Sequence, residues 1–218
     1  MKRFSFLAAL LLWCLPSLAQ ESSSVQGIPM DVYYLMPSFA QGMIYFKGQM
    51  PAQGKLNICA VDNTLRYMDA KGQEIVAAGI DNVVKVQIDT VSFVRSEGIF
   101  YRLYPVTSEL GLALRRKVLL VNDSKQGAFG TETQTSSVKE YNSVFSDGVV
   151  YSLVKDMPYK MSESLFLFKG NDVISLTKRN LQKCFPAHKA DIEAWFKAGN
   201  TLPGTAPELL SLLATWSQ

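Results

Sequence analysis

The spacing of apolar residues changes once along this chain, and that change constrains the fold more than any other feature. Between residues 30 and 176, short runs with apolar residues at every second position are separated by turn residues, which is typical of β-strands. From Thr177 onward the apolar residues recur at every third or fourth position, which is typical of amphipathic helices. The sequence therefore predicts an α+β protein, with an antiparallel, curled β-sheet or small sandwich over residues 30–176 and about three short helices over residues 177–218.

Short strands separated by turn residues fill the predicted β-rich body. Two hairpins are expected, one across the turn at residues 69–72, where Gly72 can adopt a positive φ, and one that joins residues 165–168 to residues 173–176. Residues 126–137 are rich in glycine, threonine, serine and glutamine and are expected to form a mobile loop. The other strands are expected at residues 43–46, 56–61, 64–68, 99–104, 118–121 and 149–154.

The alternation slips once between residues 83 and 94. Apolar residues occupy the even positions up to Ile88 and the odd positions from Val91 onward. A single straight strand would place these two sets on opposite faces of a sheet. We therefore expect a bulge or a sharp bend near residues 89–90, at a point where the sheet curls.

Three short helices are expected in the tail. Pro186 ends the first helix, Gly199 ends the second, and Thr205 with Glu208 forms a capping box at the start of the third. Because helices this short are seldom stable alone, we expect them to pack on the body, and the alternative is docking onto a separate partner. Their apolar stripes are Leu181, Cys184 and Phe185; Ile192, Trp195 and Phe196; and Leu209, Leu212, Leu213 and Trp216.

Residues 1–19 have the layout of a secretory signal peptide. Two cations precede an apolar run that is too short for a comfortable membrane span. The small residues Ser17 and Ala19 occupy the third-last and last positions before the expected cleavage site. We expect cleavage before Gln20, export to the periplasm or the medium, and a flexible lead-in at residues 20–29. An uncleaved membrane anchor and a lipid anchor on Cys14 are the alternatives.

The charge of the chain argues against a nucleic-acid partner. The whole chain has 22 Lys and Arg against 19 Asp and Glu, and two of the cations belong to the signal peptide, so the mature chain is almost neutral. Nucleic-acid binding rests on clustered cations. The densest cluster, Arg115, Arg116 and Lys117, fits the solvated start of a strand better than an anion site. No run after the signal peptide is long and apolar enough for an integral membrane segment.

Two cysteines remain after the expected cleavage, Cys59 in a strand-like run and Cys184 on an apolar helical face. In an oxidising compartment they could form a disulfide. The alternative, which we favour, is two separate buried thiols that behave as small hydrophobic side chains. A mature chain of this length does not need a disulfide to hold its core.

The sequence predicts no catalytic, metal or cofactor site. The single histidine, His188, lies four residues after Cys184, but Pro186 breaks the helix between them, so a Cys–His dyad is poorly supported. A half-exposed structural histidine is the simpler interpretation. Zinc needs more nitrogen or sulfur ligands than the chain supplies, and phosphate-loop and dinucleotide patterns are absent from the sequence.

Ten aromatic residues fall mostly in the expected strands. On an exposed face they could bind a sugar or a peptide, but as β-formers they also suit a sheet core, which is the interpretation we favour. They are Tyr33, Tyr34, Phe39, Tyr45, Phe46, Tyr67, Phe93, Phe100, Tyr101 and Tyr104.

Residues 185–192 follow the pattern Phe-Pro-x-x-Lys-x-x-Ile within an apolar tail that continues to residues 208–213. Together with the upstream residues 42–48 and 55–57, this ending resembles small exported proteins of unknown function from Gram-negative gut-type bacteria. The resemblance implies a β-rich body, a helical tail and an exported location. It implies no activity, cofactor or site residue.

Two classes of function follow from these observations. We favour an exported, non-catalytic cell-envelope protein that binds another macromolecule, a protein or a glycan, because catalytic patterns are lacking and edge strands can accept a partner strand. The alternative is a hydrolase that acts on a glycan or a peptide through carboxylates dispersed along the chain. A cleft that holds two facing acids would favour the hydrolase, whereas a closed body with one apolar patch would favour the binding protein.

Overall fold

The computed structural model describes residues 24–25, 28–120 and 158–217. The signal peptide expected at residues 1–19, the loop expected at 126–137 and the strand expected at 149–154 lie outside the described residues. Among the helices that the structure describes, none has the length and apolar character needed to span a bilayer.

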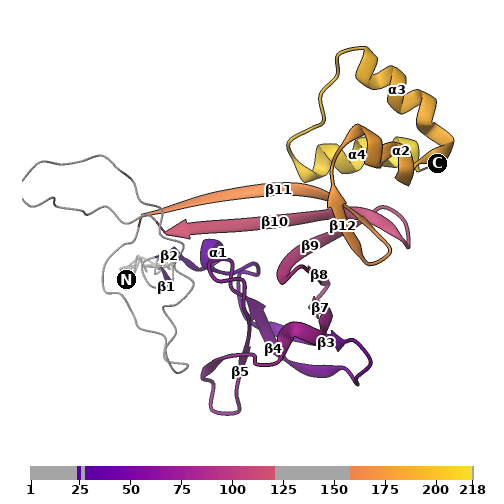
Figure 1. Ribbon diagram of the computed structural model, residues 1–218. Coiled ribbons are helices and arrows are strands. Elements are labelled where there is room, and N and C mark those ends of the chain that lie inside the picture. The colour runs from indigo at the N-terminus through magenta and orange to yellow at the C-terminus, as the bar shows by residue number, and fades with distance from the viewer. Residues whose placement is uncertain (1–23, 26–27, 121–157, 218) are drawn as a thin grey trace, which may run out of the picture.

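An open ten-stranded antiparallel sheet forms the body, in the spatial order β12-β11-β10-β9-β8-β7-β3-β4-β5-β6 (Figure 1). With the helices that follow, it confirms the predicted α+β fold. The strands are β3 (Ala40–Phe46), β4 (Ala52–Ile58), β5 (Leu65–Met68), β6 (Glu74–Val76), β7 (Val83–Ile88), β8 (Val91–Ser96), β9 (Ile99–Pro105), β10 (Leu110–Leu120), β11 (Tyr159–Lys169) and β12 (Asp172–Ser175); a separate small sheet pairs β1 (Ser24–Val25) with β2 (Ile28–Pro29).

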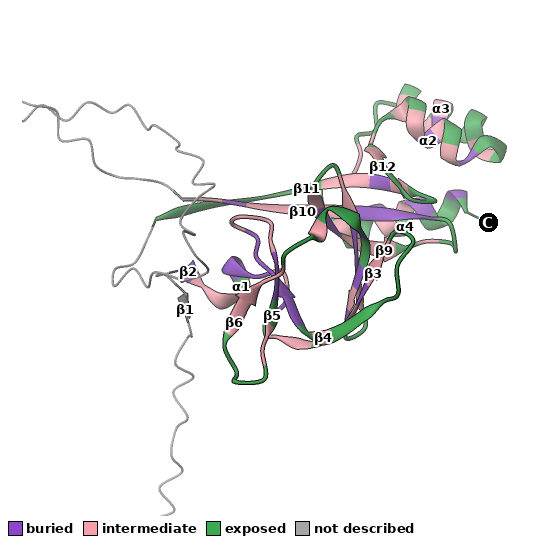
Figure 2. Ribbon diagram, turned by 60° about the horizontal axis from the view of Figure 1, so that its bottom comes forward, coloured by how far each residue is buried: buried purple, intermediate pink, exposed green. Residues whose placement is uncertain are grey.

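The part of the sheet from β9 to β5 curls around the largest core cluster (Figure 2). The side chain of Asn63, just before β5, closes this curl by two hydrogen bonds to the far side. Its Nδ2 donates to the Gly98 carbonyl at 2.6 Å, and its Oδ1 accepts from the Phe100 N–H at 3.0 Å. The buried side chains inside the curl are Met36, Ile44, Leu56, Ile58, Leu65, Val83, Val86, Ile88, Phe93 and Phe100.

Close approach of neighbouring strands explains why glycine occupies position 42 of β3. A Cβ atom there would lie 2.4 Å from the Gln87 backbone carbonyl oxygen on β7. Gly42 pairs directly with Gly54 of β4, where an added Cβ would meet only the Leu56 side chain at 3.4 Å. Of the two glycines, Gly42 is therefore the one that has no room for a side chain, because the β7 backbone lies beside it.

We expect Gly42→Ala to lower the free energy of unfolding by about 1–3 kcal/mol, because the new methyl group forces two backbones apart. Gly54→Ala on the paired strand is the matched control and should change stability little. Urea denaturation of both variants measures the difference. Equal stability of the two variants would show that β3 and β7 are not in close contact at this point.

The chain reverses at residues 89–90, where a bulge or bend in one strand was expected. β7 and β8 are two antiparallel strands, with Ile88 opposite Val91. The turn is possible because Asp89 adopts a left-handed conformation with a φ of 52°, which Asp tolerates better than most residues. The change in alternation after Ile88 thus marks the turn between two strands. The prediction of one strand with a bulge or bend was wrong.

Both predicted hairpins are confirmed. β5 and β6 pair across a turn in which Gly72 has a φ of 76°, and β11 and β12 pair across Gly170, which has a φ of 63°. β10 is much longer than the expected strand at residues 118–121, since it runs from Leu110 and pairs with β11 along its whole length.

The basic cluster therefore lies in the middle of β10 and not at the start of a strand. Arg116 forms an ion pair with Glu163 on β11, with 2.9 Å between Nε and Oε1, and its Nη1 donates to the Asp31 carbonyl at 2.8 Å. Arg115 and Lys117 lie one position to either side, so they point to the opposite face of the strand. The basic cluster is thereby divided between the two faces of the sheet.

The N-terminal segment, including the short helix α1 (Met30–Tyr33), is held against the sheet. The buried Asn57 side chain accepts a hydrogen bond from the Met36 N–H at 3.2 Å and donates one to the Met36 carbonyl at 3.0 Å. Ile28 has no exposed surface. The end of the lead-in expected to be flexible at residues 20–29 is thus fixed on the body.

The tail contains the three predicted helices, α2 (Lys178–Cys184), α3 (Lys189–Lys197) and α4 (Ala206–Trp216), with a 3-10 turn η2 (Pro186–His188) after α2. Gly199 closes α3 with a φ of 81°, as expected. The capping box is only partly formed, because the Thr205 hydroxyl donates to the Glu208 carboxylate at 2.8 Å and makes no bond to the backbone.

The tail packs on one end of the sheet, above β10 to β12 (Figure 1). Its buried side chains share a cluster with Leu110 and Leu112 of β10 and Leu167 of β11. The tail residues of this cluster are Leu181, Phe185, Ile192, Leu209, Leu213 and Trp216.

Candidate functional site

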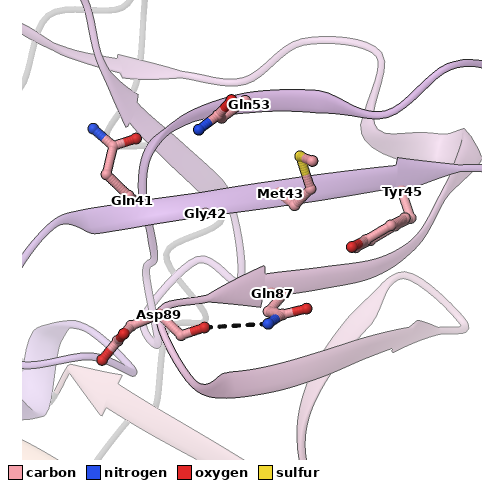
Figure 3. A pocket seen from close by; sticks show the side chains of 7 residues that line it. All are labelled: Gln41, Gly42, Met43, Tyr45, Gln53, Gln87 and Asp89. Carbon is pink, nitrogen blue, oxygen red and sulfur yellow. Dashed lines mark hydrogen bonds between the residues drawn. The ribbon is translucent and has the colours of Figure 1, made fainter.

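A shallow hollow lies on the outer face of the sheet, over β3 and its two neighbours (Figure 3). Its volume is about 270 Å³. At its centre Met43 of β3 lies opposite Gln53 of β4 on one side and opposite Gln87 of β7 on the other. The described residues that line it are Gln41, Gly42, Met43, Tyr45, Gln53, Gln87 and Asp89.

Strand alternation turns these side chains away from the core. Ile44 of β3 is buried inside the curl, so its neighbours Met43 and Tyr45 lie on the outer face. Ile88 of β7 is likewise buried inside, and Gln87 lies outside. The alternation of side chains along β3 and β7 therefore places one set in the core and the other set in the hollow.

Two contacts order the rim of the hollow. The Gln87 side-chain amide donates to the Asp89 backbone carbonyl at 3.3 Å (dashed in Figure 3). The Lys85 ammonium nitrogen lies 5.8 Å from the centroid of the Tyr45 ring, a cation–π contact between paired residues of β7 and β3. The Tyr45 ring leans from β3 towards β7, over the same gap as Gln87 (Figure 3).

The groups in the hollow suit the binding of hydroxyl groups. Each of the three glutamine side chains carries amide N–H donors and a carbonyl acceptor. The Tyr45 ring adds a flat apolar surface with a hydroxyl group. Asp89 is the one carboxylate among the described residues of the lining. A mostly neutral, donor- and acceptor-rich surface beside an aromatic ring can hold an uncharged polar ligand.

A second cluster of functional groups is buried around Arg66 of β5, whose side chain has no exposed surface. Its Nη2 lies 2.5 Å from Asp62 Oδ2, and its Nη1 lies 2.6 Å from Glu74 Oε1. Its Nε donates to the Thr64 hydroxyl at 3.0 Å. The Tyr34 hydroxyl donates to the other Glu74 oxygen at 2.6 Å, which ties the N-terminal segment to the edge strand β6.

The pKa values of Tyr34, Cys59 and Arg66 are all raised in this cluster. Burial raises the pKa of Tyr34 above its usual range, and the hydrogen bond to Glu74 raises it further. Burial also raises the pKa of Cys59 to about 12. Burial lowers the pKa of Arg66, but the acidic groups around it, Asp62 and the hydrogen-bonded Glu74 among them, raise it, and the net shift is upward, so the guanidinium stays charged. These three groups therefore keep their protons near neutral pH, and the ion pairs and hydrogen bonds of the cluster stabilise the fold.

Cys184 and His188 lie together in another hollow, of about 310 Å³, between the tail and the β9–β10 turn. The structure thus brings the two residues to one place despite the break at Pro186. The His188 ring is held by Asp191, with 3.0 Å between Nδ1 and Oδ2. Burial raises the pKa of the Cys184 thiol against a smaller opposing effect of Lys169, whereas a nucleophilic cysteine needs a lowered pKa. The dyad therefore lacks an activated thiol.

Both cysteines are free in the structure. Cys59 packs with the N-terminal segment in one cluster, and Cys184 packs against the tail cluster at the other end of β10. This arrangement agrees with two separate thiols and not with the disulfide between them. Within the described ranges, no group of three or more His, Cys, Asp or Glu side chains could hold a metal ion.

Most of the aromatic residues contribute to the interior, as expected. Tyr33, Tyr34, Phe93, Phe100 and Tyr101 are buried, and Phe39, Phe46 and Tyr104 are partly buried and pack against core clusters. The exceptions include Tyr45, which lines the hollow on the outer face, and Tyr67, which is 36% exposed.

Sequence reasoning missed the glutamines of the hollow. Gln87 alternates with the apolar residues of residues 83–88, so its outward position was readable, whereas Gln41 and Gln53 lay outside the strands expected from the sequence. What brings them together is the pairing of β3 with both β4 and β7. β4 follows β3 closely in the sequence, but the pairing with β7 joins positions as distant as Met43 and Gln87 and cannot be read from local spacing.

Comparison of the chain with protein-family models, with curated proteins and with solved structures finds no match. The interpretation of the hollow therefore depends on its own residues and geometry.

Proposed function

We propose that this chain is an exported, non-catalytic protein of the cell envelope that binds another macromolecule, a protein or a glycan, and that the hollow over β3 is its binding site. A glycan is the better match, because amide groups and an aromatic ring recognise hydroxyl groups and sugar rings. The amide-rich lining is the observation that carries this proposal. Export is supported by the signal-peptide layout of residues 1–19.

The chemistry of the hollow favours binding over hydrolysis. Glycoside hydrolysis generally uses two carboxyl groups on either side of the scissile bond. Asp89 supplies one carboxylate in the described lining. The acids Asp62 and Glu74 lie on the same cation, because the buried guanidinium of Arg66 pairs with both.

Affinity electrophoresis tests the binding function. The protein migrates through gels with and without polysaccharide isolated from the envelope of the native host. We expect the polysaccharide to retard the wild-type protein and to retard the double variant Gln41→Ala/Gln87→Ala much less. Gln49→Ala, at an exposed glutamine between β3 and β4, is the matched control and should behave as the wild type does. Equal migration of all variants with and without polysaccharide would contradict a glycan-binding role.

Export makes a separate prediction. We expect the intact mass of the protein from its native host to correspond to a chain that begins at Gln20, or within a few residues of it. Mass spectrometry of the purified protein measures this. Retention of residues 1–19 in the bulk of the protein would contradict cleavage.

A further inference from the structure

We infer that the ligand of the hollow is a neutral oligosaccharide that lies along β3, with one sugar ring on Tyr45 and the chain continuing past Gln53 and Gln87 towards Gln41. This inference rests on the proposed glycan-binding function and specifies the charge, the length and the orientation of the ligand. Each of the three follows from a different feature of the hollow.

The length of the hollow argues for several sugar units and not one. Tyr45 and Gln41 stand four residues apart on β3, which is about 14 Å along an antiparallel strand. Gln53 and Gln87 flank Met43 on the two neighbouring strands, about 10 Å apart across two strand spacings. Polar groups thus recur at both ends and in the middle, along a path longer than a single sugar ring.

The orientation follows from the position of the aromatic ring. Tyr45 is the one aromatic side chain in the described lining, and it stands at one end. Lys85 contacts its ring, which restrains the ring in place. A ring held in this way is a platform for the apolar C–H face of a sugar, so the chain begins there and runs towards Gln41.

The charge of the ligand follows from the lining. Its described ionisable side chains are Tyr45 and the carboxylate of Asp89, which repels an acidic sugar at the Gln41 end. The lysines on this face, Lys55 and Lys85, are paired in register with Gln41 and Tyr45 but stand outside the lining. An acidic chain therefore meets the like charge of Asp89 at the Gln41 end, whereas a neutral chain is not repelled there.

Isothermal titration calorimetry with defined saccharides tests the inference. The neutral probes are maltotriose, cellotriose, mannotriose and chitotriose, each compared with its own monosaccharide, and the acidic probe is trigalacturonate. We expect at least one neutral trisaccharide to bind at least about tenfold more tightly than its monosaccharide and than trigalacturonate. Tyr45→Ala should weaken that binding about tenfold or more, while Tyr67→Ala, at an exposed tyrosine of β5, should not change it.

Asp89→Asn separates charge from shape, because asparagine also tolerates the left-handed conformation of this turn. We expect it to raise the affinity for trigalacturonate relative to the affinity for the neutral trisaccharide. Tighter binding of the acidic probe by the wild type, equal binding of monosaccharide and trisaccharide, or an unaffected Tyr45→Ala would overturn the inference while glycan binding stands. If no neutral or acidic probe and no envelope polysaccharide binds, the proposed function fails together with the inference.

Discussion

Replacement of Arg66 by alanine is expected to lower the free energy of unfolding by about 3–5 kcal/mol. The side chain is fully buried, and its removal leaves the carboxylate of Asp62, which is 7% exposed, without its cation. Glu74 loses the same partner and remains bonded to Tyr34. An uncompensated buried charge costs more than the ion pair contributes, which makes this position more sensitive than any exposed pair.

Chemical denaturation of Arg66→Ala measures the loss. Lys178→Ala is the control, since Lys178 pairs with Glu193 on the surface and such pairs contribute about 0–1 kcal/mol. The triple variant Arg66→Met/Asp62→Asn/Glu74→Gln removes all three charges and should recover part of the stability lost by Arg66→Ala. A loss for Arg66→Ala no larger than that for Lys178→Ala would show that the Arg66 cluster is not buried in solution.

Trp216→Ala is expected to cost about 3–5 kcal/mol, a large share of the ~5–15 kcal/mol that stabilises a typical domain. Trp216 is 7% exposed, and its ring makes edge contacts with Phe185 and with Trp195. Because the tail shares its cluster with Leu112 and Leu167 of the sheet, the tail and the body should unfold together. We expect a single thermal transition at a clearly lower temperature.

Trp195→Ala provides the comparison for this prediction. The position of Trp195 in the apolar stripe of α3 predicts that its replacement by alanine lowers the melting temperature strongly. In the structure, however, its side chain is only partly buried against the cluster. Its replacement should therefore cost less than that of Trp216. An unchanged melting temperature for Trp216→Ala, or rapid proteolysis of the tail in the wild type, would indicate that the tail docks onto a separate partner.

The sequence predicted local features well, because each depends on neighbouring residues. The turns at Gly72 and Gly170 and the end of α3 at Gly199 follow from the conformational freedom of glycine, and all three are confirmed. The three tail helices follow from apolar spacing and are also confirmed. The reversal at Asp89 was misjudged, because an aspartate in the left-handed region is less common than a glycine and the phase slip alone does not distinguish a bulge from a turn.

Features that depend on long-range pairing could not be predicted. β10 was expected only at residues 118–121, because Gly111 and the basic residues obscure the alternation of apolar residues. Its full length becomes evident only from its pairing with β11, which is distant in sequence. The cluster around Arg66 was missed because Glu74 joins it only when β5 pairs with β6, and Tyr34 only when the N-terminal segment packs on that edge. The hollow over β3 needs three strands in register, and one of them, β7, is distant in sequence from the other two.

Backbone amide chemical shifts reveal whether the outer face of β3 binds a glycan. Labelled protein is titrated with the envelope polysaccharide of the native host, reduced to short oligosaccharides, and shift changes are mapped onto the fold. We predict saturable changes at Gln41, Met43, Tyr45, Gln53 and Gln87, with little change around His188 and Trp216. Saturable changes confined to the tail hollow, or no changes at all on β3, β4 and β7, would contradict glycan binding at this face.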